Sequence, residues 1–237
     1  PFLQKEDFND NQLKILRLLM EQSYIQKDLQ TALGISSPGL LYHLNKLEDM
    51  QLIQKETIQQ IGNAKINEIR IEPLQLQTIR KLIGMKVEKC TLFTGFGEKL
   101  TGYRIPDIGY RLLQSEYRID EIVCVTTEKG KKIRENHQTE ENLLEISNYY
   151  FAKDYHEFKY RKSPFLQNLD KMLLKEMKNS DLILDLTPWS KLYAFELLKR
   201  ANKYNLVCYY LGMDEDGENS LIWMTDVKIK GEYKEKK

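Results

Sequence analysis

The residues of this chain best suited to chemistry are hydroxyl, glycine and lysine residues in three short polar segments, each of which follows a run of apolar residues. The segment from Asp185 to Lys191 is the most informative, because Thr187 suits the N-cap of a helix and Pro188 its first turn. Backbone amides at a helix start attract phosphate or carboxylate groups, and an indole can stack on a base. The residues expected to bind such a ligand are Thr187, Pro188, Trp189, Ser190 and Lys191. The alternative is that the threonine and proline only cap the helix while the indole packs on the sheet.

The other two segments offer amides, hydroxyls and lysines to the same kind of ligand. Thr94–Lys99 reads Thr-Gly-Phe-Gly-Glu-Lys and leaves backbone amides open to an anion, although Leu100 takes the place of the third glycine of the dinucleotide fingerprint. Thr126–Lys129 supplies two hydroxyls and a cation, and an ordinary polar turn is equally consistent with it. From these two segments we expect ligand contacts from Thr94, Gly95, Phe96, Gly97, Thr126, Thr127 and Glu128.

Cysteine and histidine residues are too scattered in the sequence for a metal site or a disulfide. Zinc sites need closely spaced ligands or a histidine cluster with a carboxylate beside it. We therefore expect no metal, no cofactor and no catalytic residue, and we interpret the cysteines as buried thiols in a reducing compartment. The residues concerned are Cys90, Cys124, Cys208, His43, His137 and His156.

Buried strands that alternate with amphipathic helices must position the three polar segments. Apolar runs predict strands at Cys90–Phe93, Ile122–Thr126, Leu182–Leu186 and Val207–Leu211, a further strand near Tyr155–Tyr160, and a final hairpin around Asp216-Gly217 with Leu221–Thr225 as its second arm. Helical spacing of apolar residues predicts helices at Ile105–Glu116, Ser163–Lys178 and Trp189–Tyr204. This alternation is typical of a parallel, doubly wound sheet, in which ligands bind beyond the carboxyl ends of the strands.

The N-terminal part of the chain has a different pattern, in which three helices precede a hairpin. Helices are predicted over Asn11–Met20 and Ile25–Leu33, and Gly34 ends the second one. The third helix opens at Ser36 or Ser37, has Pro38 in its first turn, and repeats apolar residues at Leu40, Leu41, Leu44 and Leu47. A β-hairpin follows, with Gly62-Asn63 as its turn. This order indicates a winged helix-turn-helix, in which the third helix enters the major groove of DNA and the wing touches its backbone.

The segment Leu29–Ile53 resembles ArsR- and MarR-like regulators in its Leu-Gly-Ile-Ser turn and its His-Leu-x-x-Leu helix. That resemblance implies double-stranded DNA as a partner. The residues it implies to face DNA are Ser36, Ser37, Gly39, Tyr42, His43 and Lys46 of the third helix and Lys55, Asn63 and Lys65 of the wing. Packing of Tyr42 against the first helix and full solvation of His43 are the alternatives. Gln51 departs from the family, which usually has glycine at that position.

The charge of the N-terminal part does not by itself indicate DNA binding. Residues 1–80 contain nine Lys and Arg against ten Asp and Glu, whereas phosphate contacts usually leave a basic footprint. A winged helix that binds protein is therefore the alternative. Leu76, Ile79 and Ile83 then mark an amphipathic helix that needs a partner, which is either the chain's own domains or a second chain, and we prefer the interpretation that it joins two copies of the chain. The expected domains are a DNA-binding domain at 1–72, a linking and dimerisation helix at 73–88 and a Rossmann-like ligand-sensing domain at 89–237.

The sequence from Asp181 to Leu211, DLILDLTPWSKLYAFELLKRANKYNLVCYYL, resembles the CRISPR-associated Rossmann fold (CARF). The loop of that family commonly runs Asp-Leu-Thr-Gly-Gly-x-Lys/Arg, and Pro188 and Trp189 stand here in place of the two glycines. The resemblance extends over roughly residues 89–223. It implies a homodimeric regulator of a kind typical of archaea, which binds cyclic oligoadenylate across its two-fold axis.

Composition restricts the class of protein. With 237 residues, 41% hydrophobic and 30% charged, no apolar run long enough for a membrane span and no evident signal segment, we expect two globular domains in the cytosol. The leading hypothesis is a transcription regulator without enzymatic turnover that senses a nucleotide. The alternatives are an NAD(H)-sensing redox repressor, an assembly module whose winged helix binds protein, and a nuclease that degrades cyclic oligoadenylate with Thr94, Thr187 and Lys191 near the reacting phosphate.

Overall fold

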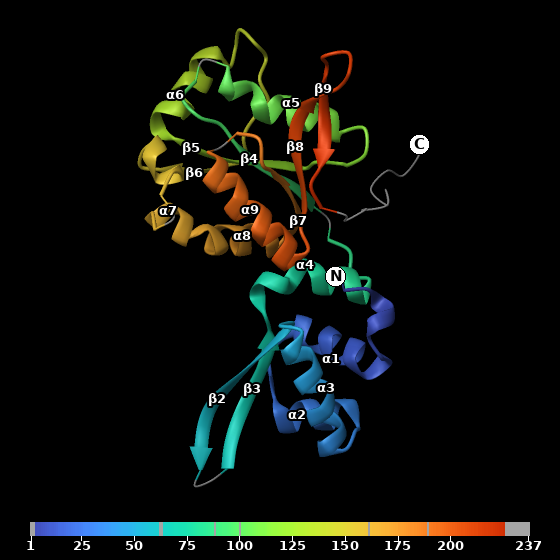
Figure 1. Cartoon of the computed structure of the whole chain (residues 1–237). Coiled ribbons are helices and arrows are strands. Elements are labelled where there is room, and N and C mark those ends of the chain that lie inside the picture. The colour runs from blue at the N-terminus through green and yellow to red at the C-terminus, as the bar shows by residue number, and fades with distance from the viewer. Residues whose placement is uncertain are drawn as a thin grey trace. The chain divides into compact units, whose positions relative to one another are not determined.

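The computed structural model describes two compact units that divide between Lys86 and Val87. The described residues are 3–61, 64–87, 89–99, 101–160, 162–188 and 190–225. Figure 1 shows a helical unit with a long β-hairpin, called unit 1 below, and an α/β unit, called unit 2. A winged helix-turn-helix followed by a mostly parallel sheet with helices confirms the expected fold class.

Unit 1 combines helices with a small antiparallel sheet. Its elements are α1 (Asp10–Glu21), β1 (Tyr24–Ile25), α2 (Gln26–Leu33), α3 (Ser37–Asp49), β2 (Ile53–Ile61), β3 (Ala64–Ile71) and α4 (Leu76–Ile83), with 3-10 turns η1 (Lys5–Asp7) and η2 (Pro73–Gln75). The strand order is β1-β3-β2, and β2 and β3 form the hairpin of the wing (Figure 1). The expected turn Gly62-Asn63 lies outside the described residues, and Ile61 pairs with Ala64 on either side of it.

Local capping explains where the helices of unit 1 begin and end. Asn9 caps α1, because its side-chain oxygen accepts a hydrogen bond from the Gln12 amide at 3.0 Å. Gly34 ends α2 with a φ of 65°, a conformation that glycine adopts without strain. Ser36 caps α3 by accepting a hydrogen bond from the Gly39 amide at 3.3 Å, and a proline stands in the first turn.

The apolar faces of α1, α2 and α3 meet in one core. Fully buried members of this core are Leu16, Leu29, Leu40, Leu44 and Leu47. The expected apolar stripe of α3 was wrong at one position, since Leu41 is 45% exposed. Successive helical residues point about 100° apart, so Leu41 cannot share the buried face that Leu40 and Leu44 define.

Helix α4 packs within unit 1. It contacts α1, and its residues Ile79 and Leu82 are buried in the unit 1 core. This helix occupies the segment expected to link the domains, residues 73–88. Much of its apolar stripe is therefore covered by the chain itself, and the pairing of two chains through this helix stays a prediction.

Gln51 forms the turn from α3 into the wing with a φ of 57°. This left-handed conformation is uncommon for residues that carry a side chain, and glycine adopts it readily. The departure from the usual family glycine therefore places a residue with a side chain in a backbone conformation that disfavours one.

Unit 2 is built on one sheet, with strands β4 (Lys89–Gly95), β5 (Glu121–Thr127), β6 (Asn148–Ala152), β7 (Ser180–Asp185), β8 (Val207–Met213) and β9 (Asn219–Trp223). Its helices are α5 (Ile105–Leu113), α6 (Glu128–His137), α7 (Pro164–Gln167), α8 (Leu169–Met177) and α9 (Lys191–Tyr204), with 3-10 turns η3 (Gly102–Arg104) and η4 (Tyr155–Phe158). The strand order is β6-β5-β4-β7-β8-β9. All neighbours are parallel except β9, which pairs antiparallel with β8 as the expected final hairpin.

Helices cover both faces of this sheet (Figure 1). On the face covered by α5 and α6, Leu113 and Ile133 pack into a core with strand residues such as Leu92 and Cys124. Helices α8 and α9 cover the other face. Burial from both sides explains why β4, β5 and β7 are continuous apolar runs rather than alternating ones.

The three cysteines are buried thiols outside any disulfide of the described residues, and they are Cys90, Cys124 and Cys208. Among the described residues, no group of three His, Cys, Asp or Glu side chains is arranged to hold a metal ion. Within the same part of the chain, every helix is too short or too polar to cross a membrane.

Two sequence predictions for unit 2 were wrong. The segment Tyr155–Tyr160 is not a strand but contains η4, because the Asp154 carboxylate accepts a hydrogen bond from the His156 amide at 2.8 Å and closes a turn. The edge strand is β6, which lies upstream. The helix expected over Ser163–Lys178 is two helices, α7 and α8, which meet at Asn168.

Helix α6 was missed by the sequence analysis. It consists mostly of charged residues and has no apolar stripe that a periodicity argument can detect. Thr127 caps it by accepting a hydrogen bond from the Gly130 amide at 3.1 Å.

Candidate functional site

The order of the strands places a ligand crevice between β4 and β7. From β4 the chain runs outward to β5 and β6, and β7 then returns to the opposite side of β4. The loops that leave β4 and β7 therefore diverge beyond the carboxyl ends of two parallel strands. Open α/β sheets bind their ligands at such a point, where the strand order reverses.

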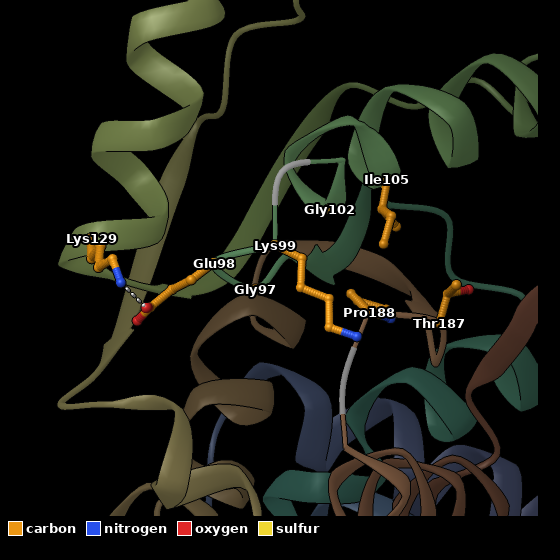
Figure 2. A pocket seen from close by; sticks show the side chains of 8 residues that line it. All are labelled: Gly97, Glu98, Lys99, Gly102, Ile105, Lys129, Thr187 and Pro188. Atoms are coloured by element: carbon orange, nitrogen blue, oxygen red, sulfur yellow. Dashed lines mark ion pairs between the residues drawn. The ribbon is translucent and has the colours of Figure 1, made fainter.

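A cavity of about 550 Å³ occupies this crevice (Figure 2). Its volume lies within the range of small-molecule sites. The lining comes from the loops after β4 and β7, from η3 and from the starts of α5 and α6, and consists of Gly97, Glu98, Lys99, Gly102, Ile105, Lys129, Thr187 and Pro188. We call this cavity the switch-point pocket.

Two lysines and one glutamate set the charge of the switch-point pocket. Lys99 is exposed and extends across the pocket toward Pro188 (Figure 2). Lys129 forms an ion pair with Glu98, at 2.9 Å between Nζ and Oε2. The other oxygen of Glu98 accepts a hydrogen bond from the Thr127 hydroxyl at 2.9 Å. The bond to Lys129 lowers the pKa of Glu98, so this carboxylate is ionised at neutral pH.

Asp185 holds the loop after β7 from beneath the pocket. Its carboxylate is fully buried and accepts hydrogen bonds from the Thr94 hydroxyl at 2.8 Å and from the Thr187 amide at 2.9 Å. Burial raises the pKa of this carboxyl group. Asp185 therefore joins the ends of β4 and β7 and positions the loop, rather than facing a ligand.

The structure brings only part of the expected ligand set into the switch-point pocket, namely Gly97, Thr187 and Pro188. Four others are buried beneath it, and they are Thr94, Gly95, Phe96 and Thr126. The Thr94 hydroxyl donates to Asp185, and the Thr126 hydroxyl donates to the Phe96 carbonyl at 2.8 Å. These groups hold the floor of the pocket together and are not open to a ligand.

The remaining expected ligand residues lie beside the switch-point pocket. Thr127 caps α6, and Glu128 faces a neighbouring cavity lined by β6, η4 and α7. Ser190 caps α9, and Lys191 is the exposed first residue of that helix. Trp189 lies outside the described residues.

Helix α9 begins later than the sequence predicts. Ser190, not Thr187, is its N-cap and accepts a hydrogen bond from the Tyr193 amide at 3.3 Å. The Thr187 hydroxyl instead accepts a hydrogen bond from the Leu211 amide of β8 at 2.8 Å. Threonine and serine both suit a helix start, and the long-range bond to Leu211 is invisible in the local sequence.

The expected ligand contacts left out five residues that line the switch-point pocket, although three of them lie in the segments Thr94–Lys99 and Thr126–Lys129; the five are Glu98, Lys99, Gly102, Ile105 and Lys129. A signal for three of them was present, because a Glu-Lys pair follows both β4 and β5 and parallel strands end at the same edge. Glycine and isoleucine of the loop before α5 gave no comparable signal.

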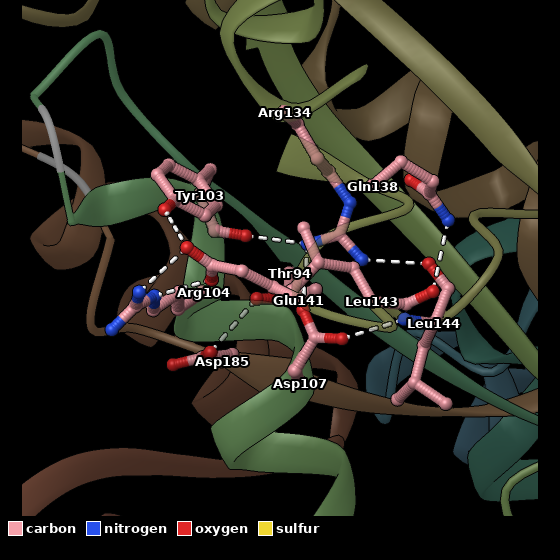
Figure 3. A network of polar contacts seen from close by, with 10 residues as sticks. All are labelled: Thr94, Tyr103, Arg104, Asp107, Arg134, Gln138, Glu141, Leu143, Leu144 and Asp185. Carbon is pink, nitrogen blue, oxygen red and sulfur yellow. Dashed lines mark hydrogen bonds and ion pairs between the residues drawn. The ribbon is translucent and has the colours of Figure 1, made fainter. Parts of the chain in front are cut away.

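A buried ion pair fixes the helices behind the pocket (Figure 3). Arg134 of α6 is fully buried and pairs with Asp107 of α5 at 2.6 Å. The same guanidinium donates to the carbonyl oxygens of Tyr103 and Leu144, and the other oxygen of Asp107 accepts from the Leu144 amide at 2.7 Å. A buried charge needs such satisfied partners, so this network holds α5, α6 and the turn that follows α6 in one arrangement.

Glu141 extends the network to the surface (Figure 3). Its carboxylate accepts from both the guanidinium of Arg104 and the hydroxyl of Tyr103, each at 2.6 Å. These bonds, that of Arg104 first, lower the pKa of Glu141 to about 2. The ring of His137 stacks on Tyr103 with 4.7 Å between centroids. The cluster ties η3, which precedes α5, to the end of α6.

The exposed face of α3 is the candidate DNA-reading surface of unit 1. Residues exposed on it are Ser37, Leu41, Tyr42, Asn45 and Lys46, and Ser36 is exposed at its cap. Gly39 is half-buried. The Lys46 ammonium lies over the Tyr42 ring at 5.0 Å from its centroid. Leu41 and Asn45 were not expected here, and they lie one helical turn apart on the same face.

Two of the expected DNA contacts turn toward the protein instead. Lys55 of β2 pairs with Glu48 at 2.5 Å and donates to the Asn45 side chain at 2.7 Å. His43 is half-buried, and its Nε2 accepts from the Asn11 side chain of α1 at 3.5 Å. These contacts place Lys55 and His43 as supports of α3. In the wing, Lys65 is exposed, whereas Asn63 lies outside the described residues.

Comparison with protein families supports this geometry for unit 1. Residues 9–55 match the helix-turn-helix model of bacterial regulatory proteins of the arsR family. The match covers α1, α2, α3 and the first residues of β2. None of the curated proteins compared with the chain matches it.

The solved structures that match the chain include the following three, all of low identity. Can2 from Sulfobacillus thermosulfidooxidans, in complex with cyclic tetra-adenylate, is 14% identical with a TM-score of 0.37, over 55% of this chain and 36% of its own. Csm6 from Enterococcus italicus, bound to cyclic hexa-2'-fluoro-hexa-dAMP, is 15% identical with a TM-score of 0.34, over 53% and 34%. Human N-acetylserotonin methyltransferase in complex with SAM is 11% identical with a TM-score of 0.26, over 89% and 76%. The chain covers about a third of the first two proteins.

Proposed function

We propose that this chain is a DNA-binding transcription regulator whose unit 2 binds a phosphate-bearing ligand in the switch-point pocket. The observation that carries the ligand half is the position of that pocket, where the strand order reverses and Lys99 extends across it. The DNA half rests on the family match over residues 9–55 and on the exposed polar face of α3.

A nucleotide is the ligand that suits the lining best. Backbone amides of the loop at Gly97 and the ammonium of Lys99 suit phosphate oxygens, and the apolar side chains of Ile105 and Pro188 suit a base or ribose. The resemblance to CARF domains implies cyclic oligoadenylate. A cavity of about 550 Å³ suits part of such a ring, so two copies of the chain would share one ligand across a two-fold axis.

Regulation follows if the ligand prefers one arrangement of the two recognition helices. A dimer presents two α3 helices to two half-sites, and their spacing decides the affinity for the operator. A ligand changes that affinity only by binding one arrangement more tightly than the other.

The two enzymatic or redox alternatives have less support. For a nuclease, Thr94 is buried and committed to Asp185, while Lys191 does not line the pocket that Thr187 lines. For an NAD(H) sensor, the dinucleotide fingerprint requires a helix to begin within the glycine loop. Here α5 begins only at Ile105, after the separate turn η3.

The test combines ligand and DNA binding on the same protein. Mass spectrometry of the native protein identifies retained small molecules, and titration with cyclic tetra-adenylate measures affinity. Lys99→Gln should weaken that affinity roughly tenfold or more, because it removes a full charge from the pocket. Operator fragments selected from random DNA are then bound with and without ligand at several salt concentrations. Absence of ligand binding at micromolar concentration contradicts the sensor, and linear adenylate products would support the nuclease.

A further inference from the structure

We propose that Glu98 is a specificity-determining residue of the switch-point pocket, whose charge engages Lys129 and so weakens the binding of ligands with two or more phosphate groups more than that of ligands with one. This inference rests on the proposed function, since it names the class of phosphate ligand that Glu98 disfavours in the same pocket.

The two lysines of the pocket differ in their partners. Among the described residues, Lys99 forms no ion pair, so its charge is available to any anion that enters. The Lys129 ammonium is neutralised by Glu98 at 2.9 Å. The pocket thus contains one permanent cation and one cation whose charge depends on the position of Glu98.

Glu98 itself is held more firmly than its partner. The Lys129 side chain is 73% exposed, whereas that of Glu98 is 28% exposed and also accepts from the Thr127 hydroxyl at 2.9 Å. When a ligand phosphate takes Lys129, Glu98 therefore retains the threonine and stays beside the pocket. Exposed ion pairs of this kind are weak, so the exchange is energetically accessible.

The consequence is a preference between ligands. A single phosphate is bound by Lys99 and does not compete with Glu98 for Lys129, so the charge of Glu98 affects its binding little. A second phosphate can replace Glu98 as the partner of Lys129, but it also meets the repulsion of the displaced carboxylate. Removing the negative charge of Glu98 should therefore strengthen the binding of two-phosphate ligands more than that of one-phosphate ligands.

The experiment compares inorganic phosphate, pyrophosphate and cyclic tetra-adenylate as probes by calorimetric titration. Glu98→Gln keeps an oxygen that can accept from Thr127 and removes only the charge. We expect it to tighten pyrophosphate binding by roughly threefold to tenfold and phosphate binding by less than about twofold. The double variant Glu98→Gln with Lys129→Gln should not show the tighter pyrophosphate binding, because that gain in affinity comes from the Lys129 charge that the loss of Glu98 makes available.

The matched control is Glu121→Gln. Glu121 pairs with Lys89 at 2.6 Å, the two side chains are 33% and 53% exposed, and both residues begin their strands at the opposite end of the sheet. We expect no change in the affinity for either probe. An equal gain in Glu121→Gln would mean that net charge alone is responsible and would overturn the inference.

Failure of this inference is distinguishable from failure of the proposed function. If the unaltered protein binds cyclic tetra-adenylate or pyrophosphate and Glu98→Gln binds pyrophosphate equally or more weakly, the role of Glu98 is disproved while the sensor stands. If neither the unaltered protein nor Glu98→Gln binds any of the three probes, the sensor itself is disproved. Circular dichroism establishes that each variant is folded before it is scored.

Discussion

Lys55 in the wing of unit 1 and Lys129 at the pocket of unit 2 both pair with a glutamate, yet their surroundings differ. The side chain of Lys55 is 14% exposed, and it binds both Glu48 and the Asn45 amide oxygen. The side chain of Lys129 is 73% exposed, and among the described residues its ion-pair partner is Glu98. Both lysines follow polar residues in the sequence, and nothing local distinguishes them.

The difference teaches that burial, more than pairing, decides what a lysine can do. A largely buried ammonium with two partners loses much if either partner is removed, so Lys55 acts as a support for α3. An exposed ammonium exchanges its partner for water or a ligand at little cost, so Lys129 is able to respond to a phosphate. The same type of ion pair is thus a structural contact in unit 1 and an exchangeable contact in unit 2.

The largest effect is expected where burial is complete, at the Arg134–Asp107 pair. Asp107→Ala leaves the Arg134 charge buried without its carboxylate and also removes the acceptor of the Leu144 amide. We expect a loss of about 3–5 kcal/mol in the free energy of unfolding of unit 2, measured by urea denaturation. The exposed Glu121→Ala should cost less than about 1 kcal/mol. Similar losses in both variants would show that burial is not the deciding factor.

The next effect is expected at Lys55. Lys55→Met keeps the aliphatic stem but removes the charge that binds Glu48 and Asn45, and we expect a loss of roughly 1–2 kcal/mol in the stability of unit 1. Operator affinity should fall because Asn45 loses its orientation, while the slope of affinity against salt stays unchanged.

Lys65→Gln is the control for Lys55→Met. Lys65 is exposed on β3, so its removal should leave stability unchanged and lower the salt slope by about one, as expected for a lysine that contacts phosphate. If Lys55→Met instead reduces the slope of operator affinity against salt, that result would support the phosphate contact that the sequence predicts for Lys55.

The same contrast explains how much the sequence could predict. Strands β4, β5 and β7 were predictable because each is an apolar run that two helical layers bury, and β8 because its first half is a buried apolar run. The recognition helix was predictable because Ser36 and the repeat of leucines are local signals. Helix α6 was not, because it is mostly charged and is held by the long-range pair of Arg134 with Asp107.

The candidate site was predicted in place but only partly in composition. The loops that line the cavity were predictable because the carboxyl ends of parallel strands share one edge. Which side chain enters the pocket depends on partners distant in sequence, as when Asp185 takes the Thr94 hydroxyl. A polar side chain in the sequence therefore predicts that a polar contact is made. Whether that contact is to a ligand or to another part of the protein depends on the fold.

A smaller effect is expected from acid at Glu141. The bonds from Arg104 and Tyr103 hold its pKa at about 2, below the ordinary 4.5, so folding favours the ionised form. The stability that these bonds contribute is present above pH 4.5 and is lost as the pH falls toward 2. In Glu141→Gln this part of the acid dependence should be absent when urea midpoints are compared between roughly pH 6 and pH 3, a range that covers the upper part of that window. Equal slopes in both proteins would contradict the role of this cluster.

The smallest effect on stability is expected at Lys129, and it is the sharpest test of the comparison. Lys129→Gln removes an exposed partner, while Glu98 keeps the hydrogen bond from Thr127, so the free energy of unfolding of unit 2 should change by less than about 0.5 kcal/mol. The same variant should weaken the binding of cyclic tetra-adenylate, because the ligand can no longer bind the ammonium group of Lys129. Stability thus separates the two lysines, since Lys55→Met destabilises its unit and Lys129→Gln does not. If Lys129→Gln lowers the free energy of unfolding as much as Lys55→Met does, Lys129 is a structural residue like Lys55. A different residue at the rim of the pocket would then have to bind the phosphate.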